Sequence, residues 1–130
     1  MEHIDNVEMS INFRMARHGK LAQRNILWDR TLSQITIILT VLVPFGIFAL
    51  LNIPYQDQTA VKVITLIASG LAMVCHSISM TMKFREKFRF HKEQEADYTT
   101  LWLEFSNQQI DDKVALKKMN NLMKNDVKEP

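Results

Sequence analysis

The chain has 130 residues, 47% of them hydrophobic, and carries 16 lysines and arginines against 14 aspartates and glutamates, for a formal net charge of +2. This length suits one domain and excludes a catalytic barrel or a two-lobed enzyme, and so small a charge gives no reason to expect nucleic-acid binding. Its single cysteine excludes an internal disulfide. With only three glycines and three prolines, we expect neither a glycine-rich phosphate loop nor a turn-rich β fold.

Residues 1–30 are predicted to form a cytoplasmic amphipathic helix. Its apolar positions recur at spacings of three and four, at Ile4, Val7, Ile11 and Met15. Its basic positions form a second stripe, made of Arg17, Lys20 and Arg24. We expect the helix to lie on anionic lipid or to pack on another cytoplasmic helix. A ligand site for a nucleic acid or nucleotide on the basic stripe is the less favoured alternative.

Residues 31–82 are predicted to form a transmembrane hairpin. No aspartate, glutamate, lysine or arginine occurs in residues 31–56 or 63–82. The predicted spans, 32–53 and 63–82, would be about 33 and 30 Å long as helices, enough for a hydrocarbon core of about 30 Å. A soluble domain of this size could hardly surround two helices that are apolar on every side.

The basic residues around the hairpin predict its orientation. Ten of them flank the two ends: Arg14, Arg17, Lys20, Arg24, Arg30, Lys83, Arg85, Lys87, Arg89 and Lys92. Only Lys62 lies in the turn. Because lysine and arginine are retained on the cytoplasmic side of a membrane, both termini are expected in the cytoplasm.

The second span carries one narrow face of small and polar residues. Its members are spaced four and three apart: Thr65, Ser69, Ala72, His76 and Ser79. Small and hydroxylated residues allow close helix packing, whereas an ionisable side chain in a span usually faces a cavity or a partner. The face is therefore a candidate either for lining a water-filled pore or for helix packing, and the two are compatible in a bundle of several hairpins.

Residues 83–130 are predicted to form a cytoplasmic helical region. A mostly aromatic heptad seam follows the second span, with members at Phe84, Phe88, His91, Glu95, Tyr98, Trp102 and Phe105. No glycine or proline interrupts residues 83–109, so the helix is expected to run straight on from the membrane. The seam implies a packing partner: the N-terminal helix, the C-terminal helix or a neighbouring subunit.

A last short helix is predicted after Asp111 or Asp112, either of which suits its N-cap, and residues 125–130 are expected to fray. The sequence shows no catalytic signature, and we expect no enzyme activity, cofactor or metal. His91 and Glu95 are four residues apart, but two ligands are too few for a metal site, so ion pairing or capping is the better interpretation.

The order of these elements resembles the SLATT family of bacterial two-transmembrane effector domains associated with nucleotide-sensing conflict systems. The resemblance covers about residues 6–124 and rests on two sets of positions. Before the hairpin they are Arg14, Ala16, Arg17, Ala22, Arg24 and Asn25. After it they are Phe84, Glu86, Lys87, Phe88, His91, Tyr98, Leu101 and Glu104. The resemblance implies an antiviral defence effector that forms pores or disrupts the membrane. With no fused sensor domain expected here, a separate sensor protein or a nucleotide signal would trigger it.

The sequence thus predicts an all-α integral membrane protein that forms a homo-oligomer in the lipids of the bacterial inner membrane. The favoured function is a pore-forming or membrane-disrupting defence effector. The main alternative is a non-conducting membrane scaffold, immunity or phage-encoded interaction protein. A proton-coupled transporter with His76 as its relay is less favoured, because the spans contain no carboxylate.

Overall fold

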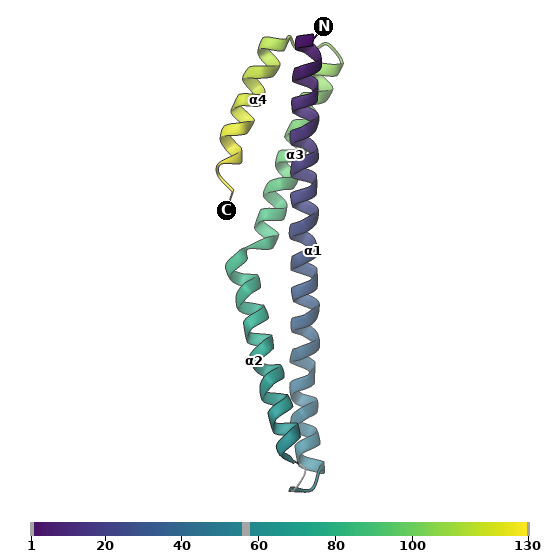
Figure 1. Cartoon of the computed structure of the whole chain (residues 1–130), viewed down its shortest axis with the longest axis vertical. Coiled ribbons are helices and arrows are strands. Elements are labelled where there is room, and N and C mark those ends of the chain that lie inside the picture. Colours follow the sequence, from purple (N-terminus) through teal and green to yellow (C-terminus); the bar gives the residue numbers. More distant parts are fainter. Residues whose placement is uncertain (1, 56–57, 130) are drawn as a thin grey trace. The chain divides into compact units, whose positions relative to one another are not determined.

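The computed structural model describes residues 2–55 and 58–129, with side chains from Asn6 onward. Four helices account for almost all of the described residues, and no strand occurs among them. They are α1 (Glu2–Asn52), α2 (Gln58–Met82), α3 (Phe84–Ser106) and α4 (Asp112–Asp126), shown in Figure 1. The predicted all-α fold is confirmed.

Helix α1 joins the predicted N-terminal helix and the first span into one element of 51 residues. The sequence between Lys20 and Val43 contains no glycine or proline, so nothing local ends the helix before the apolar run. Pro44 lies inside the helix without ending it.

The second span does not continue straight into the next helix, contrary to the sequence prediction. Helix α2 ends at Met82, and α3 begins at Phe84. Lys83 between them has a φ of 50°, in the left-handed region that residues other than glycine seldom adopt. Such a conformation costs about 1–2 kcal/mol for one residue, and the interruption falls at the boundary between the two compact units of the chain.

The chain divides into two compact units, each described here by itself. The helical unit contains α1 as far as Ile26, together with α3, α4 and the residues that follow α4. The hairpin unit runs from Leu27 to Lys83 and contains the rest of α1 with α2.

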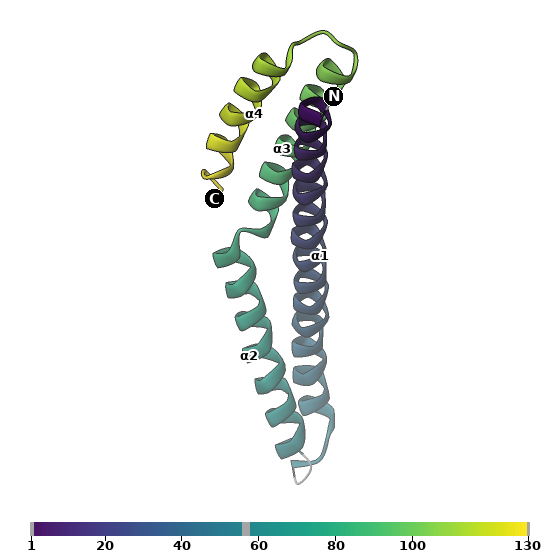
Figure 2. The same cartoon turned by 45° about the horizontal axis from the view of Figure 1, so that its top comes forward.

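The apolar core of the helical unit is shared by its three helices. Its buried members are Val7 and Ile11 from α1, Tyr98, Leu101 and Phe105 from α3, and Ala115 and Met119 from α4. Figures 1 and 2 show α4 running back along α3 after the turn that follows Ser106. The predicted apolar stripe of α1 faces this core through Val7, Ile11 and Met15, while the side chain of Ile4 lies outside the described residues.

Helix α4 begins where the sequence predicted, but without the expected side-chain cap. Asp111 holds the N-cap position with extended backbone, and its carbonyl accepts a hydrogen bond from the amide of Ala115 at 2.9 Å. The Asp111 carboxylate makes no capping hydrogen bond. Burial of Ala115 and Met119 therefore anchors this helix more than its cap does.

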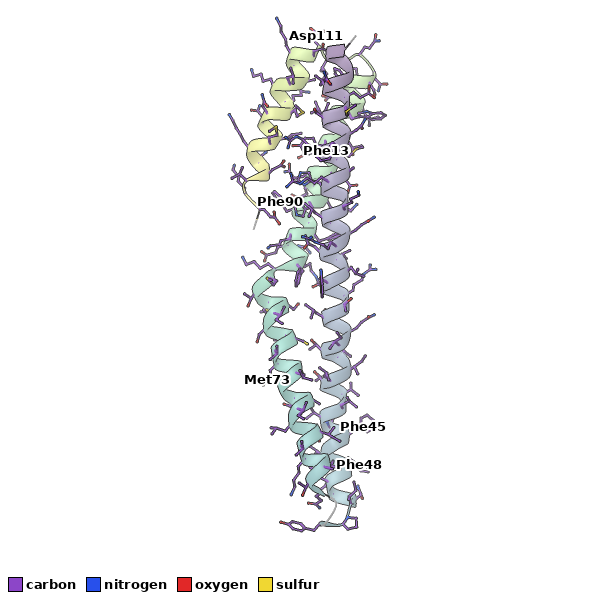
Figure 3. All side chains as sticks on the ribbon, viewed as in Figure 1. Phe13, Phe45, Phe48, Met73, Phe90 and Asp111 are labelled. Atoms are coloured by element: carbon purple, nitrogen blue, oxygen red, sulfur yellow. The ribbon has the colours of Figure 1, made fainter. Side chains whose placement is uncertain are left out.

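The hairpin unit exposes most of its large apolar side chains. Its two helices are each long and apolar enough to cross a membrane, and only 0% and 6% of the residues in their most apolar windows are buried within the chain. Three large exposed side chains are labelled in Figure 3: Phe45 and Phe48 on α1, and Met73 on α2. Large apolar surfaces of this kind are uncommon on soluble monomers.

Candidate functional site

The most unusual polar feature of the molecule is a pair of buried histidines in the helical unit. His18 of α1 and His91 of α3 are 5% and 2% exposed. Their Nδ1 atoms lie 3.1 Å apart, which is a hydrogen-bonding distance, and their ring centroids are 5.3 Å apart. One nitrogen of this contact must donate a proton and the other must accept it. The pair therefore links two helices across 73 residues of sequence through one shared proton.

Two carboxylates from the C-terminal end flank the histidine pair. Glu129 Oε1 lies 3.3 Å from Nε2 of His91 and accepts its hydrogen bond. Asp126 Oδ1 lies 3.3 Å from Nε2 of His18, an ion-pair distance. This Oδ1 atom is buried and has no hydrogen-bond partner among the described residues. A positive charge on His18 would therefore compensate its burial.

Tyr98 and Arg14 complete the cluster around Asp126. The hydroxyl of Tyr98 donates to Asp126 Oδ2 at 3.2 Å, and the guanidinium of Arg14 lies 3.7 Å from the same oxygen. Burial raises the pKa of Tyr98 to about 12, and the nearby Asp126 carboxylate reinforces this shift. The phenol therefore remains a donor throughout the physiological pH range. Its ring also stacks on His18, with centroids 5.6 Å apart.

The surroundings of His91 disfavour its charged form. Burial lowers the pKa of His91 below its ordinary value of 6.5, and the facing His18 lowers it further. Glu129 and Asp126 act in the opposite direction, but desolvation is the largest effect. The site therefore favours a neutral His91 side chain that is hydrogen-bonded on both ring nitrogens. Among the described residues, no group of three or more histidine, cysteine, aspartate or glutamate side chains is placed to hold a metal ion.

Sequence reasoning identified only part of this cluster. It singled out His91 but assigned its partner to Glu95, which instead forms an ion pair with Lys92 at 2.6 Å. It gave His18 no role. The fraying of residues 125–130 stays a prediction, and Pro130 lies outside the described residues. Within them, α4 extends to Asp126, and Asp126 and Glu129 each lie 3.3 Å from a histidine Nε2 atom. The only local signal for His18 was its place on the inward face, seven residues after Ile11.

The predicted aromatic seam of α3 faces into the helical unit. His91, Tyr98 and Phe105 are buried, and the remaining members, Phe84, Phe88, Glu95 and Trp102, are partly buried. The seam contacts two of the three partners that the sequence allowed. His91 contacts His18 of the N-terminal helix α1, and Tyr98 contacts Asp126 of the C-terminal helix α4. Burial of the seam thus does not require a neighbouring subunit, and its role in an oligomer stays a prediction.

The basic stripe of α1 lies on the side of that helix that faces away from the core of the helical unit. Arg17, Lys20 and Arg24 are all exposed, whereas His18 and Ala22 between them are buried. The stripe is thus available to lipid headgroups or to a ligand. Either role stays a prediction.

The polar face of the second span is partly buried within the hairpin unit and approaches α1 closely at Thr65. Thr65, Ser69, Ala72 and Ser79 are partly buried, whereas His76 is exposed. A methyl group added at Gly46 of α1 would lie only 2.0 Å from Oγ1 of Thr65, so the helices approach closely here. Close packing through small residues is the usual means of helix association in membranes. At Thr65, the geometry thus favours packing over pore lining within a single hairpin.

A surface groove of about 940 Å³ lies in the helical unit, beside the turn between α3 and α4. It is lined by Glu8 and by residues of the turn and its flanks, including Phe105, Ile110, Asp111 and Lys113. The groove is separate from the histidine cluster, since none of the cluster residues lines it.

Comparison of the chain with protein-family models, with curated proteins and with solved structures finds no match. Functional argument therefore rests on the residues themselves.

Proposed function

We propose that the chain is an oligomeric membrane effector that forms pores or disrupts the membrane, in a bacterial defence or conflict system. The observation that carries the proposal is the exposed apolar surface of the hairpin unit, whose two helices bury almost none of their apolar residues within the chain. Burying apolar surface gains about 25 cal/mol per Å², so burial of this surface in a membrane is favoured over exposure to water, and the proposal places the chain in the inner membrane. The resemblance to the SLATT family supplies the effector role.

Conduction would require several hairpins. The polar face of α2 meets its partner α1 at Thr65, where Gly46 approaches closely. One narrow face on one helix cannot enclose a water path by itself, so a pore needs the faces of several hairpins. His76 is the exposed member of that face, and a polar side chain at membrane depth favours contact with another polar group or with water. We therefore place the expected subunit contact in the hairpin, beside His76.

The alternative function is a non-conducting membrane scaffold or interaction protein. The packing of Thr65 against Gly46 favours it, because the same small residues then serve helix association alone. A trigger by a separate sensor protein or a nucleotide signal belongs to the effector proposal and not to the scaffold.

The orientation of the hairpin can be tested by cysteine labelling. In a Cys75→Ser background, which removes the only cysteine of the chain, Thr59→Cys should react with a membrane-impermeant maleimide in intact cells. Gln23→Cys, on exposed α1 surface, should react only after lysis, because the basic residues flank the termini. The reverse pattern would contradict termini in the cytoplasm.

Leakage separates the effector from the scaffold. In cells expressing the chain, a voltage-sensitive dye should report depolarisation. His76→Leu should reduce this leakage at least about tenfold while leaving membrane insertion intact, since leucine favours the bilayer. Val74→Leu, an exposed apolar position of the same helix, serves as the matched control and should leak like the parent. A correctly inserted oligomer that conducts nothing in liposomes would support the scaffold.

A further inference from the structure

The geometry of the histidine pair limits how many protons it can hold. Two imidazoles have four ring nitrogens. One proton on Nε2 of His91 makes the hydrogen bond to Glu129, and one proton lies between the two Nδ1 atoms. A third fits on Nε2 of His18, which faces Asp126 Oδ1 at 3.3 Å. A fourth would place an N–H group on both Nδ1 atoms, which are only 3.1 Å apart.

The closed contact therefore accommodates at most one positive charge on the two rings together. With two or three protons, the Nδ1–Nδ1 hydrogen bond persists, because one of these nitrogens still has a free lone pair. With four protons, two donors face each other with no acceptor, and two like charges share a buried site.

We propose that the His18–His91 pair is a proton-sensitive contact between α1 and α3, which stays closed while the two rings share at most one positive charge and opens when both become charged. It is a regulatory device of the helical unit and does not depend on the proposed membrane function. The proposal rests on the burial of both rings and on the hydrogen-bonding distance between their Nδ1 atoms.

The charged groups around the pair come from every part of the helical unit that packs on it. Arg14 of α1 adds positive charge beside Asp126. Tyr98 of α3 remains a neutral donor to the same carboxylate. Asp126 and Glu129 favour protonation of His91, and each lies 3.3 Å from a histidine Nε2 atom. With Arg14 charged, one protonated histidine balances these two carboxylates, and a second leaves an excess positive charge.

The direction of the pH response follows from His91. Its pKa is lowered, so below its ordinary value of 6.5 the closed protein binds fewer protons than a chain with a solvated His91. The stability of the contact is therefore complete above pH 6.5 and decreases as the pH falls toward the lowered value. Acidification should open the contact, whereas a rise in pH from 6.5 should not.

Opening should remain local within the helical unit. The apolar core gathers around Ile11, Leu101 and Phe105, while His91 lies about two helical turns after the start of α3. The first turns of α3 should therefore loosen in acid while the apolar core remains packed. Local opening of this kind is visible to amide hydrogen exchange.

Titration of the histidines in the full-length chain tests the proposal directly. The chain would be labelled with ¹⁵N-histidine, held in detergent micelles and followed by NMR between pH 8 and pH 4.5. We expect the two rings to titrate as a coupled pair rather than independently, with the protonation step of His91 below 6.5. Independent titration of both rings near their ordinary value would overturn the proposal. The parent protein suffices for this measurement, so it does not depend on the folding of any variant.

Amide hydrogen exchange tests the structural consequence. Between pH 7.5 and pH 5.0, after correction for the intrinsic exchange rate, protection of residues 84–95 should fall at least about tenfold in the parent. Protection of residues 99–105 should change much less. The double variant His18→Gln/His91→Gln should lose the pH response, whereas His76→Gln, outside the cluster, should retain it. An equal pH response in the double variant would overturn the proposal, as would a pH-independent parent whose protection rises on adding zinc, which would make the pair a metal site.

Discussion

Replacing Tyr98 with alanine is expected to lower the free energy of unfolding of the helical unit by about 3–5 kcal/mol. Tyr98 is fully buried in the core that α1, α3 and α4 share. Its loss would leave a cavity among Ile11, Leu101 and their neighbours, and it would also leave Asp126 without its phenol donor. Urea denaturation of the full chain in detergent, followed by circular dichroism, measures the effect.

The matched control for this substitution is Thr100→Ala on the same helix. Thr100 is exposed, and its hydroxyl bonds only to the carbonyl of Ala96, so its loss should change stability by no more than about 0.5 kcal/mol. If the two variants destabilise the protein equally, Tyr98 does not lie on the buried face of α3.

Tyr98→Phe separates the hydroxyl from the ring. It should cost about 1 kcal/mol, as is typical for one hydrogen bond. Because the pKa of Tyr98 is raised from 10.0 to about 12, its contribution is complete below pH 10 and is lost as the pH rises through about 12. The parent should therefore lose stability in this alkaline range more steeply than Tyr98→Phe does.

The second large effect is expected at Gly46 in the hairpin unit. An added methyl group would lie 2.0 Å from Oγ1 of Thr65 and 3.1 Å from both its Cβ and its Cγ2 atoms. Threonine is stiff at χ1 because it is β-branched, so its side chain has few ways to move aside. Gly46→Ala should therefore separate the two helices and destabilise the hairpin by about 1–3 kcal/mol. Titration with sodium dodecyl sulfate, followed by circular dichroism, measures this change.

Gly70 provides the control for Gly46, because an added methyl group there meets no atom within 4 Å. Gly70→Ala should be neutral or slightly stabilising, since alanine favours a helix more than glycine does. Adding Thr65→Ala to Gly46→Ala removes the two clashing outer atoms and should restore most of the lost stability. If Gly46→Ala and Gly70→Ala behave alike, α1 and α2 do not meet at Thr65.

Small and polar residues have different structural roles in the two units. In the hairpin unit, Gly46 and Thr65 allow two apolar helices to approach closely. In the helical unit, His18, His91 and Asp126 form a buried polar cluster whose net charge depends on pH. The first arrangement lets two apolar helices of the hairpin pack together, and the second underlies the proposed proton-sensitive contact in the unit that carries the aromatic seam.

Several properties of this protein follow from its sequence alone, because they depend on neighbours along the chain. Two runs without charges predict two long apolar helices, since the hydrophobicity of a segment is a local quantity. The spacing of Val7, Ile11 and Met15 predicts an inward face of α1, because a helix repeats every 3.6 residues. The all-helical fold follows from the same patterns together with the scarcity of glycine and proline.

Only the tertiary structure decides which distant residues meet. The contact of His18 with His91 spans 73 residues, and no periodicity in one helix specifies a partner in another. The break at Lys83 occurs in a stretch without glycine or proline and requires a left-handed backbone conformation, so no local sequence signal predicts it. Asp126 and Glu129, near the end of the chain, lie at ion-pair distance from the two buried histidines, which no local pattern predicts. Local patterns fix the helices and their apolar faces, whereas the proton-binding cluster exists only once three segments have packed together.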